Sequence, residues 1–147
     1  MATKNGWFHE NGQRVHYVDG VIHCEDGPAI IHPDGAKLYY QNGKLHRTTG
    51  PAIIRPNGLK IYYQNDKLHR TDGPAFIKAN GHQEYFQNGL LHREDGPARI
   101  FSNQIQLYYQ NGKLHRLDGP AVICPSGSKE YWIDGKQLTK EEFLRRK

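Results

Sequence analysis

The sequence has little of what secreted or membrane-spanning proteins usually carry. Only two cysteines and one methionine occur among its 147 residues. No run of about 18 apolar residues, the length of a membrane-spanning helix, is present. Residues 1–6 lack the apolar segment of a secretory signal peptide. We therefore expect a soluble, unprocessed protein that works in the cytoplasm.

The two cysteines are too far apart in the sequence pattern to form a disulfide. Cys24 lies in the first full copy of a repeat described below, and Cys124 lies in the last. Stacked copies would place them at opposite ends, whereas a disulfide needs Cα atoms within about 7 Å of each other. The pattern predicts two free thiols and a reducing compartment.

Apolar residues are also scarce, at 36% of the chain, and the mean hydropathy is -0.84. Nine tyrosines, five phenylalanines and two tryptophans are nevertheless too many for a disordered chain. A thin, elongated array that buries a narrow strip in each unit reconciles these observations. The net charge of +5 permits anionic partners without requiring them.

One segment recurs with a fixed step of 23 residues and without insertions. Such a period is the signature of stacked supersecondary units. Three sets of positions keep the step: Gly-Pro-Ala beginning at Gly27, Gly50, Gly73, Gly96 and Gly119; the histidines His23, His46, His69, His92 and His115; and the aromatics Tyr17, Tyr40, Tyr63, Phe86, Tyr109 and Trp132. The array begins near Trp7 with a partial unit, continues through five full units and closes with a half unit.

Within a unit the residues favour β-strands joined by tight turns. Residues 52–55 and 59–63 read as strands around the turn Pro56-Asn57-Gly58. An Asn-Gly or Asp-Gly dipeptide then predicts a two-residue hairpin turn in five copies, and the remaining copy has Asn65-Asp66. Residues 67–70 form a third short strand. Alternation along a strand puts Ala52 and Ile54 on one face, which we predict to be buried, with the residue between them more exposed.

The C-terminal residues change character at Thr139. Thr139-Lys140-Glu141-Glu142 has the pattern of a helix capping box. We expect a β-repeat array over residues 1–138 and a short helix over residues 139–147 that covers the last open sheet edge.

Tyr40-Gln41-Asn42-Gly43-Lys44-Leu45-His46 resembles the MORN repeat, whose core reads aromatic-x-Asn-Gly-Lys-x-His. The resemblance extends over residues 7–137, but this chain continues with Arg-x-Asp-Gly-Pro-Ala where the family has His-Gly-x-Gly. That variant is similar to repeats of bacterial and bacteriophage proteins. The resemblance implies an all-β, elongated, single-layer antiparallel β-hairpin array that serves as a scaffold for protein partners, and it supplies no catalytic residue. If the chain is phage-encoded, its compartment is the host cytoplasm, and its partner a host factor or a virion component.

The repeated histidines favour a structural role over a metal site. Zinc needs three or four ligands converging at about 2.0–2.3 Å, whereas one histidine per unit spreads these side chains apart. We expect each imidazole to bond the neighbouring turn, with Asp26, Asp72, Asp95 or Asp118 as partners. No metal and no cofactor are predicted.

Catalysis needs a distinct nucleophile or base in a pocket, and here every unit repeats the same groups. We therefore expect a protein that is not an enzyme.

Two ladders of side chains are the candidate partner-binding residues. In one interpretation each arginine only pairs with the aspartate two residues later; in the other, arginines and tyrosines form an exposed binding face. The candidates are Arg47, Arg70, Arg93, Arg116, Tyr39, Tyr62, Tyr85, Tyr108, Lys37 and Lys60.

The composition of this face suits a protein partner best, because tyrosine and arginine dominate protein interfaces. Sequence-tolerant binding of nucleic acid or another polyanion is an alternative, since bases stack on aromatics and arginines contact phosphates. Binding to anionic lipid is a weaker alternative, because no amphipathic helix accompanies the basic residues. Open sheet edges also permit homo-oligomers.

Overall fold

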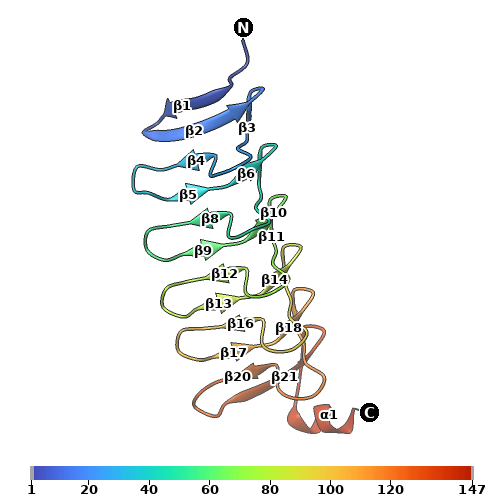
Figure 1. Cartoon of the computed structure of the whole chain (residues 1–147). Coiled ribbons are helices and arrows are strands. Elements are labelled where there is room, and N and C mark those ends of the chain that lie inside the picture. The colour runs from blue at the N-terminus through green and yellow to red at the C-terminus, as the bar shows by residue number, and fades with distance from the viewer. Residues whose placement is uncertain (1, 147) are drawn as a thin grey trace.

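The computed structural model describes residues 2–146, so Met1 and Lys147, the ends of the predicted array and helix, lie outside the described residues. The units are stacked in one row from the N-terminus to the C-terminus (Figure 1). Antiparallel hairpins make up almost the whole structure, and one short helix ends it. The predicted all-β hairpin repeat with a C-terminal helix is confirmed.

Each full unit contributes two strands to one large antiparallel sheet, and strands follow one another in the sheet as they do in the chain. The sheet therefore grows by local pairing alone. Its strands, in spatial order, are β1 (Gly6–Glu10), β2 (Gln13–Val18), β4 (Ile30–Ile31), β5 (Lys37–Leu38), β8 (Ile53–Ile54), β9 (Lys60–Ile61), β12 (Phe76–Ile77), β13 (Gln83–Glu84), β16 (Arg99–Ile100), β17 (Gln106–Leu107), β20 (Val122–Ile123), β21 (Lys129–Ile133) and β22 (Lys136–Leu138), with β3 (Val21–Ile22) paired to β2.

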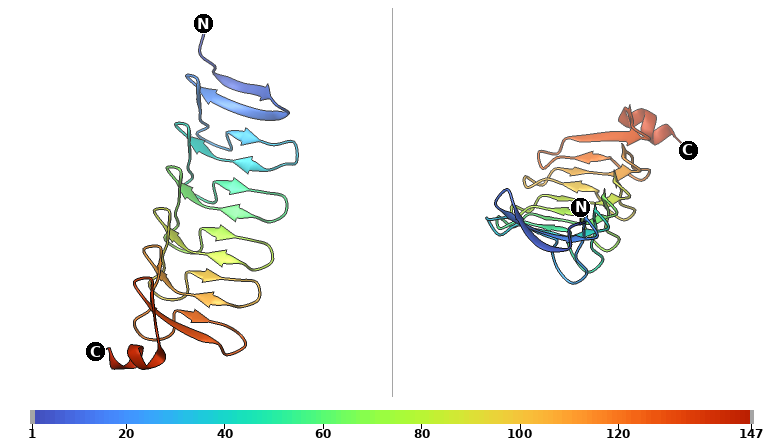
Figure 2. Two further views of the ribbon diagram at one scale, coloured as in Figure 1. Left: turned by 180° about the vertical axis from the view of Figure 1, so that it is seen from behind. Right: turned by 90° about the horizontal axis from the view of Figure 1, so that it is seen from above.

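Four units also form a small hairpin beside the large sheet, and these hairpins stack in a second row (Figure 2). They are β6–β7 (Tyr40–Gln41, Lys44–Leu45), β10–β11 (Tyr63–Gln64, Lys67–Leu68), β14–β15 (Phe86–Gln87, Leu90–Leu91) and β18–β19 (Tyr109–Gln110, Lys113–Leu114). Backbone hydrogen bonds join one hairpin to the next; the amide of Gly89, for example, donates to the carbonyl of Leu68 at 2.8 Å.

The hairpin turns have the backbone that the sequence predicted. Asn42 and Gly43 both have positive φ, at 52° and 77°, as a type I′ turn requires. Asn65 and Asp66 adopt the same conformation without a glycine. The carboxylate of Asp66 accepts a hydrogen bond from the amide of Leu45 at 2.7 Å, which offsets the strain of positive φ.

The strand predicted over residues 59–63 is interrupted at Tyr62. Residues before Tyr62 pair within the large sheet, and residues after it pair within the small hairpin. The amide of Tyr62 itself donates to the carbonyl of Ala75 in the next unit at 2.7 Å. Tyr39, Tyr85 and Tyr108 make the same bond in their units. Each of these four tyrosines therefore stands at the corner where the chain leaves one row of strands for the other.

The predicted buried strip is only half right. The repeated alanines are fully buried, but Ile54 is half-buried, whereas Ile53 beside it is only 8% exposed. Strand register explains the difference. Ile53 stands between Leu38 and Ile61 in a cross-strand row of apolar side chains, while Ile54 stands between two lysines.

One ion pair interrupts the apolar row. Glu84 and Arg99 are cross-strand partners between Phe76 on one side and Leu107 on the other. The side chain of Glu84 is 12% exposed, and its Oε2 lies 2.6 Å from Nη2 of Arg99. His82 lies 3.1 Å from its other oxygen. The two charges therefore neutralise each other between two apolar side chains.

The helix α1 (Lys140–Arg145) begins as predicted, because Thr139 and Glu142 form a reciprocal capping box. Its buried side chain, Phe143, packs on Tyr131. The Lys129–Glu130 part of β21 has a strand partner on one side only among the described residues. The expected cover of the last sheet edge is thus limited to the end of β21 that carries Tyr131. None of the helical structure in residues 2–146 is long and apolar enough to cross a membrane.

Candidate functional site

Each arginine of the predicted ladder stacks on the first tyrosine of its own unit. The guanidinium carbon lies 3.8 Å from the ring centroid in the first pair and 4.0 Å in the other three. Attraction between a cation and an aromatic face at this distance stabilises both side chains. The pairs are Arg47 with Tyr39, Arg70 with Tyr62, Arg93 with Tyr85 and Arg116 with Tyr108.

Hydrogen bonds fix the same guanidinium groups in place. Arg70 donates from Nε to Asp72 at 2.9 Å and from Nη1 to the carbonyl of Pro74 at 3.0 Å. Arg93 and Arg116 repeat both bonds. Arg47 keeps the bond to Pro51, but Thr49 stands where the other units have the aspartate. The predicted Arg–Asp pairing is confirmed in three units.

In four units the glycine of Gly-Pro-Ala leaves room for this arginine. The five glycines at this position do not have positive φ, so backbone conformation does not explain them. A β-carbon on Gly73 would lie 2.9 Å from Cζ of Arg70, closer than such atoms approach. At Gly27, where Cys24 replaces the arginine, a β-carbon would meet nothing within 4 Å. The glycine therefore gives the guanidinium room to lie against the backbone.

The histidine ladder joins successive units. Nδ1 of His69 accepts the backbone N–H of Asn88 in the next hairpin turn at 3.0 Å, and the other four histidines make the same bond. The predicted bond to the neighbouring turn is thus confirmed. The predicted aspartate partners are wrong, because those carboxylates accept from the arginines or, for Asp26, from Cys24. Nε2 of His23 instead pairs with Glu25, and Nε2 of His92 pairs with Glu94.

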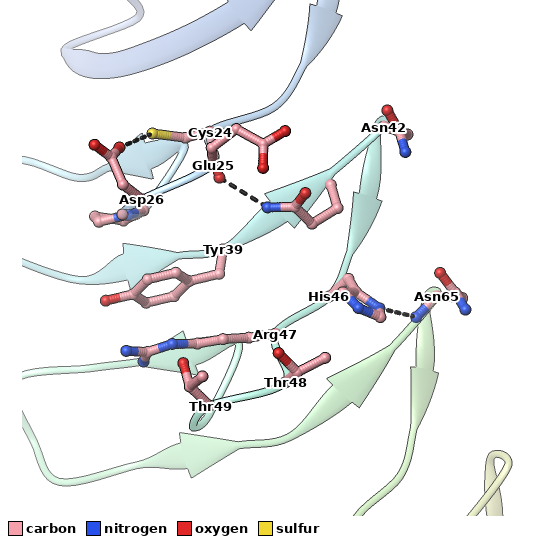
Figure 3. Close-up of a pocket in the computed structure, with 13 residues that line it drawn as sticks. Cys24, Glu25, Asp26, Tyr39, Asn42, His46, Arg47, Thr48, Thr49 and Asn65 are labelled. Carbon is pink, nitrogen blue, oxygen red and sulfur yellow. Dashed lines mark hydrogen bonds between the residues drawn. The ribbon is translucent and has the colours of Figure 1, made fainter.

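Four depressions follow one another along this side of the array, one between each pair of successive units. Their volumes run from about 380 to about 720 Å³. Neighbouring depressions share walls: Arg47 and Thr48 line the first and second, and Arg70, Thr71 and Asp72 line the second and third. Figure 3 shows the first, with the Tyr39 ring lying over Arg47 and with Thr48 and Thr49 beyond it. We call the row of four depressions the groove.

The groove is walled by side chains that are already engaged with the protein. Besides the Tyr–Arg pairs, a glutamine lines each depression, and its amide donates to a backbone carbonyl one unit earlier, as Gln64 does to Arg47 at 3.1 Å. The Tyr–Arg pairs and the glutamines of the groove are therefore held in place by contacts within the protein. Side chains that are already held in place lose less conformational entropy when a partner binds.

The charges that face solvent along the groove are negative. Arg70, Arg93 and Arg116 are only 24–25% exposed, while the carboxylates paired with them are 82–86% exposed. Glu25 and Glu94 add two more carboxylates that are about as exposed. An incoming molecule meets exposed carboxylates first, and three of the four guanidinium groups are already paired with one.

The structure brings eight of the ten predicted binding residues together. The four tyrosines and four arginines all line the groove. Lys37 and Lys60 do not: they are exposed on the large sheet, on either side of Ile54 in one cross-strand row, and line none of the four depressions.

Sequence reasoning missed the exposed carboxylates as groove residues. The Arg-x-Asp spacing signalled the pairing, but only the structure shows that the arginine lies inside and the aspartate outside. Phe143 was expected to pack, but its contact with Tyr131, the last aromatic of the row, was not predicted. Counting one period on from Arg116 reaches Thr139, the start of the helix, and could have suggested a replacement there.

The groove offers hydrogen-bonding, aromatic and charged side chains. Burial raises the pKa of the Cys24 thiol, which disfavours the nucleophilic thiolate. Among residues 2–146, no three histidine, cysteine, aspartate or glutamate side chains gather as metal ligands would. The first depression differs from the others by Cys24, which stands where the later units have an arginine.

A scan of protein-family models finds no match to this chain, and a search of curated proteins finds none either.

Proposed function

We propose that this chain is a non-enzymatic scaffold that binds a protein partner along the groove. The observation that carries the proposal is the row of four depressions with shared walls, which offers one continuous site. The resemblance to MORN repeats, whose arrays serve as scaffolds, supports the same proposal. Two free thiols support a reducing compartment such as the cytoplasm, which is that of the host if the chain is phage-encoded.

The groove has the composition of a protein-binding surface. Its tyrosines give large, rigid contact areas, and its rim supplies threonine hydroxyls and carboxylates for hydrogen bonds. Because Tyr62 is stacked on Arg70, it loses little conformational entropy when a partner docks.

The charge of the groove favours protein over nucleic acid as the partner there. A polyanion would need free cationic groups, but Arg70, Arg93 and Arg116 are already paired with aspartates. Their exposed carboxylates would repel phosphates. The lysines on the large sheet stand apart from the groove, so phosphate binding at Lys37 or Lys60 would be a separate activity.

Affinity capture with a blocked groove tests the proposal. Thr48 and Thr71 each line two neighbouring depressions, so Thr48→Trp together with Thr71→Trp places bulky side chains in the groove. A matched control carries tryptophans at two exposed positions outside the groove, Ser102→Trp and Gln137→Trp. The proposal predicts proteins that bind the native chain and the control, resist nuclease treatment and are lost with the blocked groove. It is overturned if the blocked groove captures the same proteins, or if capture disappears with nuclease.

A further inference from the structure

The groove repeats with the period of the sheet beside it. Each unit adds two hydrogen-bonded strands to the large sheet. Strands in a sheet lie about 4.7–4.9 Å apart, so successive units are displaced by about 9.5 Å. Equivalent groups of the groove, such as Asp72, Asp95 and Asp118, therefore recur about every 9.5 Å along it.

Among regular polypeptide conformations, polyproline II matches this spacing. It has three residues per turn and rises about 3.1 Å per residue, so every third side chain returns to the same side after about 9.3 Å. In a β-strand, alternation sends residues i and i+3 to opposite sides. In an α-helix, residue i+7 returns to the same side after about 10.5 Å, which drifts by about 3 Å over three units.

The chemistry of the groove specifies which side chains should recur. Four of its five loops carry at least one carboxylate; the exception has Thr48 and Thr49. Arg70 donates a hydrogen bond to Oδ1 of Asp72, and that aspartate side chain is 82% exposed. Its Oδ2 can therefore accept a hydrogen bond from a partner. A cationic side chain in each turn of the ligand would meet one carboxylate in each such unit.

The tyrosines provide the remaining contact. Polyproline II segments dock in grooves lined by aromatic rings, because proline rings pack on them and the segment is already ordered. Tyr62, Tyr85 and Tyr108 line successive depressions, one per unit. Aromatic walls and carboxylate rims thus repeat together.

We propose that the groove binds a polyproline II segment that carries a lysine or arginine at every third residue. The inference depends on the protein-binding function proposed above, and it adds the conformation, the charge and the spacing of the bound segment. It uses the match between a turn of about 9.3 Å and a unit of about 9.5 Å together with the sign of the exposed charge.

Synthetic peptides with a fluorescent label test the spacing directly. Five Arg-Pro-Pro triplets have the required period, and five Arg-Pro-Pro-Pro quartets keep the charge and the conformation with a turn-to-turn mismatch. Five Arg-Gly-Ser triplets keep charge and sequence spacing but are flexible. Fluorescence anisotropy with the full chain is expected to show binding of the Arg-Pro-Pro peptide at least about tenfold tighter than either of the others, and weakening with added salt.

Variants of the protein test the carboxylates without removing their structural bonds. Asp72→Asn, Asp95→Asn and Asp118→Asn together keep an oxygen acceptor for each arginine and remove three exposed charges. Asp19→Asn, Asp34→Asn and Glu141→Gln remove the same charge at exposed positions outside the groove. The first triple variant should bind the Arg-Pro-Pro peptide at least about tenfold more weakly than the second.

A gain of affinity gives the sharpest check. Thr49→Asp supplies a carboxylate in the one loop without any, so it should tighten binding of the Arg-Pro-Pro peptide about three- to tenfold. Equal affinities for the triplet and quartet peptides, or equal losses in the two triple variants, would overturn the inference. So would absence of binding by all three peptides. The scaffold function has a separate readout, since proteins lost on blocking the groove would still support it.

Discussion

The ring of Phe143 lies 4.8 Å from the ring of Tyr131, in the place where an arginine stacks on a tyrosine in the preceding units. The guanidinium of Arg146 in turn lies 4.5 Å from the centroid of Phe143. The C-terminal helix thus ends the series of Tyr–Arg pairs by packing an aromatic side chain, Phe143, on the last tyrosine. Its six residues would not be stable as an isolated helix, so this contact holds it in place.

Phe143→Ala should loosen the last unit and leave the rest intact. Removing a buried phenylalanine typically costs about 3–5 kcal/mol, and in a repeat array the loss stays near the changed unit. Hydrogen exchange should therefore accelerate over residues 129–146 and stay unchanged before residue 100. Leu144→Ala is the matched control, because Leu144 is 60% exposed. Equal effects of the two substitutions would contradict the capping role.

Gly73→Ala should destabilise the protein, whereas Gly27→Ala should not. The new β-carbon at residue 73 would press on Arg70, which is held by three contacts, at a cost of about 1–3 kcal/mol. At residue 27 the site is open, and alanine should be neutral or stabilise by up to about 1 kcal/mol. Urea unfolding of both variants measures the difference. Equal midpoints would mean that the glycine has another role.

Arg70→Ala should lower the free energy of unfolding by about 2 kcal/mol. It removes the stacking on Tyr62 and the bonds to Asp72 and Pro74. Arg70→Lys should recover less than half of the loss, because an ammonium group cannot make two fixed bonds and stack at once. Lys60→Ala, at an exposed position, serves as the control and should change the midpoint little.

Nδ1 of each ladder histidine should carry no proton, because it accepts a backbone N–H. Nitrogen chemical shifts of the imidazoles measured at pH 8 would reveal this tautomer. His69→Ala should cost about 0.5–1.5 kcal/mol by removing the hydrogen bond to the amide of Asn88. His9→Ala, on an exposed residue, should cost much less. A proton found on Nδ1 would refute the assigned bond.

The two thiols should differ in reactivity. Burial raises the pKa of Cys24, so at pH 8 fewer of its molecules carry the reactive thiolate, while Cys124 is only partly buried. A thiol-reactive dye should modify one cysteine fast and one slowly. Cys124→Ser should remove the fast phase, and denaturant should make both react alike. Loss of the slow phase instead would reverse the assignment.

The sequence predicts the repeat, the turns and the capping box because each depends on neighbouring residues. Positive φ at Asn42 and the bond from Thr139 to Glu142 are local features with local signals. The interruption at Tyr62 has no such signal, because it depends on the bond to Ala75 in the next unit. The orientation of Arg70 was equally hidden: the spacing fits an arginine pointing inward or outward, and only the packing of Tyr62 and Gly73 decides it.

A chain made of near-identical units can misfold by pairing each unit with the wrong copy, a shift of one whole period. The pair of Glu84 and Arg99 makes such a shift costly. The carboxylate of Glu84 is bonded to the guanidinium of Arg99 in the native register, and a shift of one period would place it against an isoleucine or a valine. Burying an unpaired charge would cost several kcal/mol. The Glu84–Arg99 ion pair therefore favours the native strand register over a register shifted by one unit.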